Sequence, residues 1–399
     1  MIKTNKVLAR IQFITSIGNH IGFFGVVYAL YVITGSALKA GLLMAIQQVG
    51  HALAAAIYPF LLIKFDPKRL IILTQFISLL VLGLVYFLLQ KFTINIVQYV
   101  YLFMTIVAFL DRIYLMATEY FSKTISDMDN SHREKQGQII SAFFGAQFLG
   151  PIFSFILLTY FHYGLSIMLD AISFIFAIIS GLSLQFLVLK EKLRTDISHS
   201  YIKNLKYIIK DNQLRRLLLT RSFFSFIPLG IFNIYIFDVI STDLKLGMEF
   251  MGLSYAVIGL SGSVGVALLR WIDKTDMVDE SIFCAIGSIC MAITLVPYLV
   301  MQNFTGAIIT AITFGLFMGS STLASQSLRR KITDSKYFPT FLSVELIIST
   351  LTGAIVGKFC VNLSAHFGLT SKLALLISVP WYFILALFYS KLKLNKSMN

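Results

Sequence analysis

Twelve apolar stretches, each long enough to cross a membrane as a helix, dominate this sequence. A helix needs about 20 residues to span a hydrocarbon core of roughly 30 Å, and every stretch is close to that length. The stretches cover residues 7–33, 40–63, 70–89, 96–117, 139–160, 164–189, 217–240, 250–269, 281–300, 305–323, 341–363 and 373–389. This pattern predicts an all-α integral membrane protein with twelve transmembrane helices.

Basic residues are concentrated in every second connection between these stretches. If Met1 is cytoplasmic, 26 of the 33 Lys and Arg residues lie in cytoplasmic tails and connections. The opposite connections hold only Lys39, Lys91, Lys245 and Lys372. Short cationic loops resist translocation, so this bias predicts that both termini are cytoplasmic. We expect a multi-pass protein of a cell inner membrane or plasma membrane.

Composition limits the possible partners. With 57% hydrophobic and 13% charged residues, the chain has too little polar surface for a soluble protein of 399 residues. A sequence pI near 9.6 could indicate nucleic acid, but the positive charge lies beside apolar spans, where anionic membrane lipids are the expected counter-ions. Cys284, Cys290 and Cys360 lack metal-like spacing. We expect a monomer that binds a small molecule and lipids, with no nucleic acid, metal or cofactor.

The longest connection, residues 190–216, divides the chain into two halves of six spans. Its apolar residues recur at helical spacing between lysines, which predicts an amphipathic helix on the cytoplasmic membrane surface; they are Tyr201, Ile202, Leu205, Ile208 and Ile209. Residues 1–189 and 217–399 are then two pseudo-symmetric six-helix bundles, because adding about 206 to a loop position in the first lands near its counterpart. Two parallel repeats are typical of a transporter with substrate held between them.

Several segments resemble one branch of a known family. They are 34–38 (TGSAL), 65–69 (FDPKR), Gly150-Pro151 and 169–174 (LDAISF), together with the amphipathic connector and residues 326–336. In this order they resemble the macrolide-efflux and enterobactin-exporter branch of the major facilitator superfamily. The resemblance implies the major facilitator fold and a secondary active exporter that alternates between inward-open and outward-open states, commonly in exchange for protons.

The resemblance also indicates gating residues, although the sequence departs from the pattern around them. The superfamily's loop after the second span normally supplies Gly and Asp, where this chain has Pro59 and Ile63. We expect Lys64, Asp66, Lys68 and Arg69 to act as a gate, with Asp66 pairing with Lys68, Arg69 or a helix end; the alternative is that these charges only set topology.

A second gating motif is Gly150-Pro151 in the fifth span. Proline removes a helix hydrogen bond and glycine permits close packing, so a bend or a tight helix crossing is expected. Its role is either a seal against leak or ordinary packing. The glycine pair that often follows in the branch is replaced by Phe153, Ser154 and Phe155, which weakens the antiporter interpretation.

Ionisable residues inside the spans are candidates for coupling, because charges near a bilayer centre are costly without a cavity or a partner. Asp111 is expected to carry a proton and Arg112 to meet an anionic group on the substrate or another helix; both could instead form a structural network. Glu345 is either a proton carrier or the partner of Arg329, Arg330 or Lys331 at a cytoplasmic gate. Asp170 matches a family position that the resemblance implies is architectural.

Polar residues in other spans complete the candidate site. His20 titrates in the physiological range and is assigned to proton coupling, with interhelical hydrogen bonding as the alternative. The candidate substrate-binding residues, besides Arg112, are Asn19, Gln47, His51, Asn233 and Asp238. By superfamily architecture, spans one, four, seven and ten line the cavity, which favours Asn19, Asp111, Arg112 and Asn233.

The sequence therefore predicts a secondary active transporter, most simply a proton-coupled exporter of an amphiphilic small molecule of the drug or siderophore type. Import of a metal chelate or nutrient, and lipid flipping on the same fold, are the alternatives. A primary pump would need a phosphate-binding loop, and residues 353–358 have the wrong spacing for one. No convergent nucleophile or ligand cluster indicates an enzyme.

Overall fold

The computed structural model describes residues 2–35, 37–90, 96–127, 132–184, 201–224, 244–245, 249–272, 279–301, 303–367 and 371–392. The first-half helices are α1 (Ile2–Thr34), α2 (Ala37–Lys64), α3 (Pro67–Leu89), α4 (Val97–Asp127), α5 (His132–Tyr160) and α6 (Tyr163–Leu182). The later elements are α8 (Tyr201–Lys210), α9 (Asn212–Leu219), the π-helix η2 (Thr220–Phe224), α11 (Glu249–Ile272), α12 (Glu280–Ile293), α13 (Val296–Met301), α14 (Phe304–Ile332), α15 (Phe338–Phe367) and α16 (Ser371–Ser390). The predicted all-α fold is confirmed for these ranges, which contain no strand.

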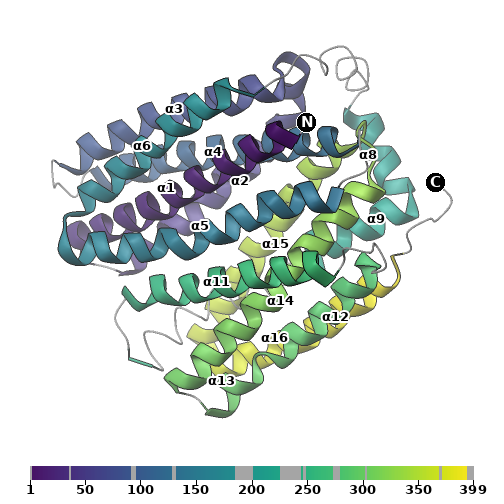
Figure 1. The fold of residues 1–399 in the computed structure, drawn as a ribbon. Coiled ribbons are helices and arrows are strands. Elements are labelled where there is room, and N and C mark those ends of the chain that lie inside the picture. Colours follow the sequence, from purple (N-terminus) through teal and green to yellow (C-terminus); the bar gives the residue numbers. More distant parts are fainter. Residues whose placement is uncertain are drawn as a thin grey trace.

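Helices of each half pack mainly on one another. In the first half α1 packs along α5 and α6, and α4 packs on α2 and α3. In the second half α14 packs on α11 and α12, and α12 on α16. Figure 1 shows these as two groups of helices, with α8 and α9 at the end of the molecule where α1 begins. We call this end the connector end.

The most extensive contacts between the halves are those of α5 with α11 and of α2 with α15. A Cβ at Gly259 of α11 would lie 2.6 Å from the backbone nitrogen of Phe148, so only glycine allows α11 to approach α5 this closely. Between α2 and α15, Ser343 Oγ donates a hydrogen bond of 2.6 Å to the backbone oxygen of Ala55. The halves are therefore in close backbone contact along α5 and α11, and a side chain of α15 bonds the backbone of α2.

The length and composition of the helices fit membrane crossing. Eight described helices are long and apolar enough to span a bilayer, and three shorter apolar segments are Ile46–Leu62, Phe338–Gly353 and Leu375–Ser390. The remaining predicted span, 217–240, lies outside the described residues from 225 onward. Phe87, Ile179 and Trp271 are exposed on the outer surface, where lipid would cover them.

The predicted connector helix is present as α8. Ile208 is fully buried against the second half, while Ile202 and Ile209 are exposed. Tyr207 stacks on Tyr337, with ring centroids 4.3 Å apart. The amphipathic pattern thus reflects a helix that docks on protein with one face, and its position at a membrane surface stays a prediction.

The C-terminal ends of three predicted spans differ most from the structure. Helices α4 and α14 continue to Asp127 and Ile332, beyond the predicted ends at 117 and 323. Both extensions lack Gly and Pro, and Lys123, Arg329 and Arg330 of these extensions have partners in other helices, as described below. Helix α6 ends at Leu182 instead of 189, and Lys68 Nζ donates to the free carbonyls of Leu182 and Leu184 at 3.0 and 2.7 Å.

Candidate functional site

A cavity of about 290 Å³ lies among α1, α2, α4, α5 and α6, and Tyr255 of α11 contributes to its wall from the second half. We call it the first-half cavity. Five of the residues predicted for proton coupling or substrate binding line it together, namely Asn19, His20, Gln47, His51 and Asp111. Helical geometry explains this, because residues three to four apart share a face and each helix turns one such face inward.

Asp111 of α4 is held by α1. Asn19 Nδ2 donates a hydrogen bond of 2.8 Å to Asp111 Oδ1, and both residues line the cavity. A carboxylate in this position has an amide partner on one oxygen and open space near it. This arrangement can accept a proton or a ligand donor group without breaking a helix contact.

Arg112 points in another direction, as expected for neighbours on a helix. It is not among the residues that line the first-half cavity. Its Nη2 lies 3.3 Å from His51 Nδ1. Because a guanidinium only donates, His51 Nδ1 accepts, which places the proton of a neutral His51 ring on Nε2.

Asp170 lines the cavity from α6, although its family position looked architectural. It packs on a glycine face of α1: a Cβ at Gly18 would lie 2.8 Å from Asp170 Oδ1, and one at Gly22 would overlap with Oδ2. Ser173 Oγ donates to the backbone oxygen of Asp170 at 2.7 Å. The two glycines therefore position this carboxylate beside α1, which sequence reasoning missed because the signal lies in two different helices.

Gly150 permits a close contact between α5 and α1. A Cβ at Gly150 would lie 2.6 Å from the Cβ of His20 and 3.2 Å from the backbone oxygen of Ile17. Pro151 follows inside the continuous helix α5. The Gly150-Pro151 motif thus borders the first-half cavity through His20, and its gating role stays a prediction.

The described contacts of Asp66, Lys68 and Arg69, which follow α2, lie within the first half. Asp66 caps α3, because its Oδ1 accepts from the backbone N–H of Arg69 at 2.8 Å, and its Oδ2 lies 3.2 Å from Arg69 Nε. Lys68 binds the end of α6, and Lys64 is exposed at the end of α2. Their predicted gating role is untested by these contacts.

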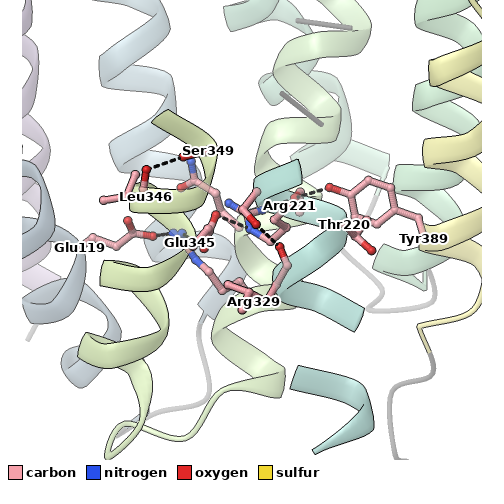
Figure 2. Close-up of polar contacts among 12 residues, drawn as sticks. Glu119, Thr220, Arg221, Arg329, Glu345, Leu346, Ser349 and Tyr389 are labelled. Carbon is pink, nitrogen blue, oxygen red and sulfur yellow. Dashed lines mark hydrogen bonds and ion pairs between the residues drawn. The ribbon is translucent and has the colours of Figure 1, made fainter. Parts of the chain in front are cut away.

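Glu345 of α15 belongs to a buried chain of ion pairs at the connector end (Figure 2). Its Oε1 lies 2.9 Å from Arg221 Nε and its Oε2 lies 2.9 Å from Arg329 Nη1. Arg329 of α14 also pairs with Glu119 of α4. We call Glu119, Arg329, Glu345 and Arg221 the gate row; it joins the first half to the second.

Two further basic residues cross between the halves. Arg330 is 1% exposed, and it donates from Nη1 to Ser122 Oγ at 3.1 Å and from Nη2 to the backbone oxygen of Glu119 at 3.3 Å. Lys123 Nζ donates to the backbone oxygen of Arg330 at 3.0 Å. The basic-loop pattern places Lys123 and Arg330 in cytoplasmic connections, and Arg330 is also one of the partners expected for Glu345. The uninterrupted helical character of 117–127 and 323–332 was the available signal for their true position.

Asn233 and Asp238, the candidate residues of the seventh span, lie outside the described residues.

Comparison with known proteins identifies the architecture. Residues 11–357 match the family model of the Major Facilitator Superfamily. No curated protein sequence matches the chain.

Solved structures share the fold over nearly the whole chain. The E. coli fucose:proton symporter FucP matches with a TM-score of 0.73 and 16% identity, covering 97% of this chain and 98% of its own. A bacterial homologue of the iron transporter ferroportin, outward-facing, has a TM-score of 0.73 and 13% identity, covering 98% and 99%. The proton:xylose symporter XylE has a TM-score of 0.74 and 12% identity, covering 98% and 96%. At these identities the likeness concerns the fold alone.

Proposed function

This chain belongs to the major facilitator superfamily, and we propose that it is a proton-coupled exporter of an amphiphilic small molecule. Members of this family are transporters and not enzymes, and the chain is a multi-pass membrane transporter. The finer assignment to efflux rests on the resemblance of segments 34–38, 65–69 and 169–174 to the macrolide-efflux and enterobactin-exporter branch.

The first-half cavity, with carboxylates in its wall, carries the proposal. The buried ion pairs of the gate row close the connector end of the same molecule. Asp111 lies in the first-half cavity with Asn19 as its partner, while the gate row joins α4 to α14 and α15. If the connector end is cytoplasmic, as the basic loops predict, this arrangement supports a state closed toward the cytoplasm. Opening requires the gate row to separate between Glu119 and Arg329.

In this mechanism Asp111 takes up the proton, and Asn19, Gln47 and His51 bind substrate, with His20 at the contact between α1 and α5. The two ion pairs of Glu345 support a gating role for it over the proton-carrier role. A buried ion pair that forms in one state and breaks in the other is a bistable contact of the kind alternating access needs.

Import by symport is the second candidate. Two of the structures with the same fold are named as proton symporters, of fucose and of xylose. Both directions use a proton-binding carboxylate in the cavity, so the geometry near Asp111 serves either one.

Transport direction can be measured with a fluorescent amphiphilic amine in cells and in inside-out vesicles, each with and without an uncoupler. An exporter gives lower accumulation in cells that express the chain, and uncoupler-sensitive uptake into inside-out vesicles. Cells that carry Asp111→Asn serve as the matched inactive strain. Uptake into intact cells that collapses on uncoupling would establish import and overturn the export proposal.

A further inference from the structure

The wall of the first-half cavity holds, among the residues described, two carboxylates beside His20 and His51, and no lysine or arginine. Asp111 and Asp170 both line it, and among its lining residues in the described part of the chain there is no Lys or Arg. Arg112, the basic residue of the same helix turn, is directed to His51 instead. Two carboxylates beside a single neighbouring arginine favour a positively charged ligand.

Gln147 of α5 adds an independent observation. Its side chain lines the cavity, it is only 9% exposed, and its Oε1 has no hydrogen-bond partner among the described residues. A buried carbonyl oxygen without a donor is destabilising, so such groups normally have a partner. The close approach of Gly259 fixes the backbone at Gln147, and Oε1 in the cavity wall is an acceptor that a ligand donor can reach.

Few donors of the protein reach the two carboxylates. Asn19 donates to Asp111 Oδ1 at 2.8 Å. Ser173 Oγ lies 3.5 Å from Asp170 Oδ1, but its single proton goes to the nearer backbone oxygen of Asp170 at 2.7 Å. An ammonium group has donors only, and it would satisfy these carboxylates and Gln147 together.

The rest of the wall suits an apolar body that carries this charge. Phe23, Phe24 and Tyr255 line the cavity together with aliphatic residues, and aromatic faces attract cations. A metal ion fits less well, because among the described residues no group of three His, Cys, Asp or Glu side chains could hold one. The combination indicates an organic cation.

We propose that the first-half cavity binds an amphiphilic amine in its protonated form, with the ammonium group donating to Asp111, Asp170 and Gln147. The proposal deepens the proposed transport function and rests on it for the consequence of binding. A proton and the ammonium group compete for the same carboxylates. Binding of the amine therefore releases the proton, and binding of the proton releases the amine, as exchange requires.

Binding to the purified full chain tests the ligand class apart from transport. Three probes share one body and differ in charge: dansylcadaverine (a primary amine), its neutral N-acetyl derivative and its anionic N-succinyl derivative. Dansyl fluorescence at neutral pH should give at least about tenfold tighter binding of the amine than of either derivative, since a charge-assisted hydrogen bond is worth more than the 1.4 kcal/mol of a tenfold change. Equal binding of all three, or preference for the succinyl probe, overturns the inference.

Variants locate the site. Asp111→Asn and Asp170→Asn keep side-chain shape and should each reduce the preference for the amine, and Gln147→Leu should weaken amine binding several-fold. Glu134→Gln removes an exposed carboxylate outside the cavity and should leave the preference unchanged. Elution as a single peak in size-exclusion chromatography checks folding. A charge preference that survives all three cavity variants places the amine elsewhere and overturns the assignment.

The two proposals fail separately. Selective binding of the amine without uncoupler-sensitive transport in vesicles would contradict export and retain the cation site. Transport of the acetyl and succinyl probes as fast as the amine would contradict the cation site and retain the exporter.

Discussion

The gate row is a set of alternating charges whose sum is zero. Glu119, Arg329, Glu345 and Arg221 follow one another, and all are buried or nearly so in the described structure. Removing charges from water is costly, and each ion in the row depends on its neighbours for compensation. The free energy of unfolding therefore depends on the balance of the row more than on the number of its ion pairs.

Replacing Glu345 tests this balance. Glu345→Gln leaves the gate row with two arginines and one carboxylate, that of Glu119, so we expect a loss of about 3–5 kcal/mol of stability, as for other broken buried pairs. Arg221→Gln in addition restores neutrality and should recover part of that loss. Thermal unfolding in detergent measures both. Losses of stability that simply add in the double variant would contradict the dependence of stability on the charge balance of the gate row.

Asp111 is the residue on which proton coupling depends in our proposal. Asp111→Asn keeps the hydrogen-bonding shape beside Asn19 but cannot release a proton, so we expect coupled transport to be abolished while folded protein remains in the membrane. Proton movement and probe transport in proteoliposomes are the measurements, with Glu134→Gln as the control. Full coupling in Asp111→Asn would remove this residue from the mechanism.

At the scale of elements, apolar periodicity predicted where helices lie but not where all of them end. A hydropathy pattern treats Lys123 and Arg330 as solvated, because it cannot include partners that come from another helix. These residues lie in the continuations of α4 and α14, and their donors reach backbone and hydroxyl oxygens across the two halves. For the same reason Asp111 was recognised as a candidate from its own span, whereas the contact of Asp170 with Gly18 and Gly22 was not.

The glycine face of α1 offers a test of helix packing. A Cβ at Gly22 would overlap with Asp170 Oδ2, so Gly22→Ala should separate α1 from α6 and cost about 1–3 kcal/mol. Gly83→Ala is the matched control, because nothing lies within 4 Å of a Cβ there, and alanine is the better helix former by roughly 0.8–1 kcal/mol. The midpoint temperature of thermal unfolding should fall for Gly22→Ala and stay level or rise for Gly83→Ala. An equal change of the midpoint temperature in both variants would mean that α1 can move away from α6 without loss of stability, and it would contradict this packing.

At the scale of the whole molecule, the halves meet along α5 with α11 and along α2 with α15, and at the connector end the gate row links α4 to α14. Adjacent residues of α14 have different partners there. Arg330 binds the first half through Ser122 and the backbone of Glu119, whereas Lys331 pairs with Glu280 inside the second half. Arg330 and Lys331 are therefore a matched pair of adjacent basic residues, of which the first joins the halves and the second does not.

Arg330→Ala should shift the molecule toward the state that is open at the connector end, because it removes donors that act only while the halves touch. Spin labels at Arg69→Cys and Lys391→Cys, in a chain without its three native cysteines, report the distance between the halves by electron paramagnetic resonance. We expect a larger population of long distances in Arg330→Ala and an unchanged distribution in Lys331→Ala. Because both variants remove one positive charge at the same end, an equal shift in both would trace the effect to charge and contradict the role of Arg330 as a link between the halves.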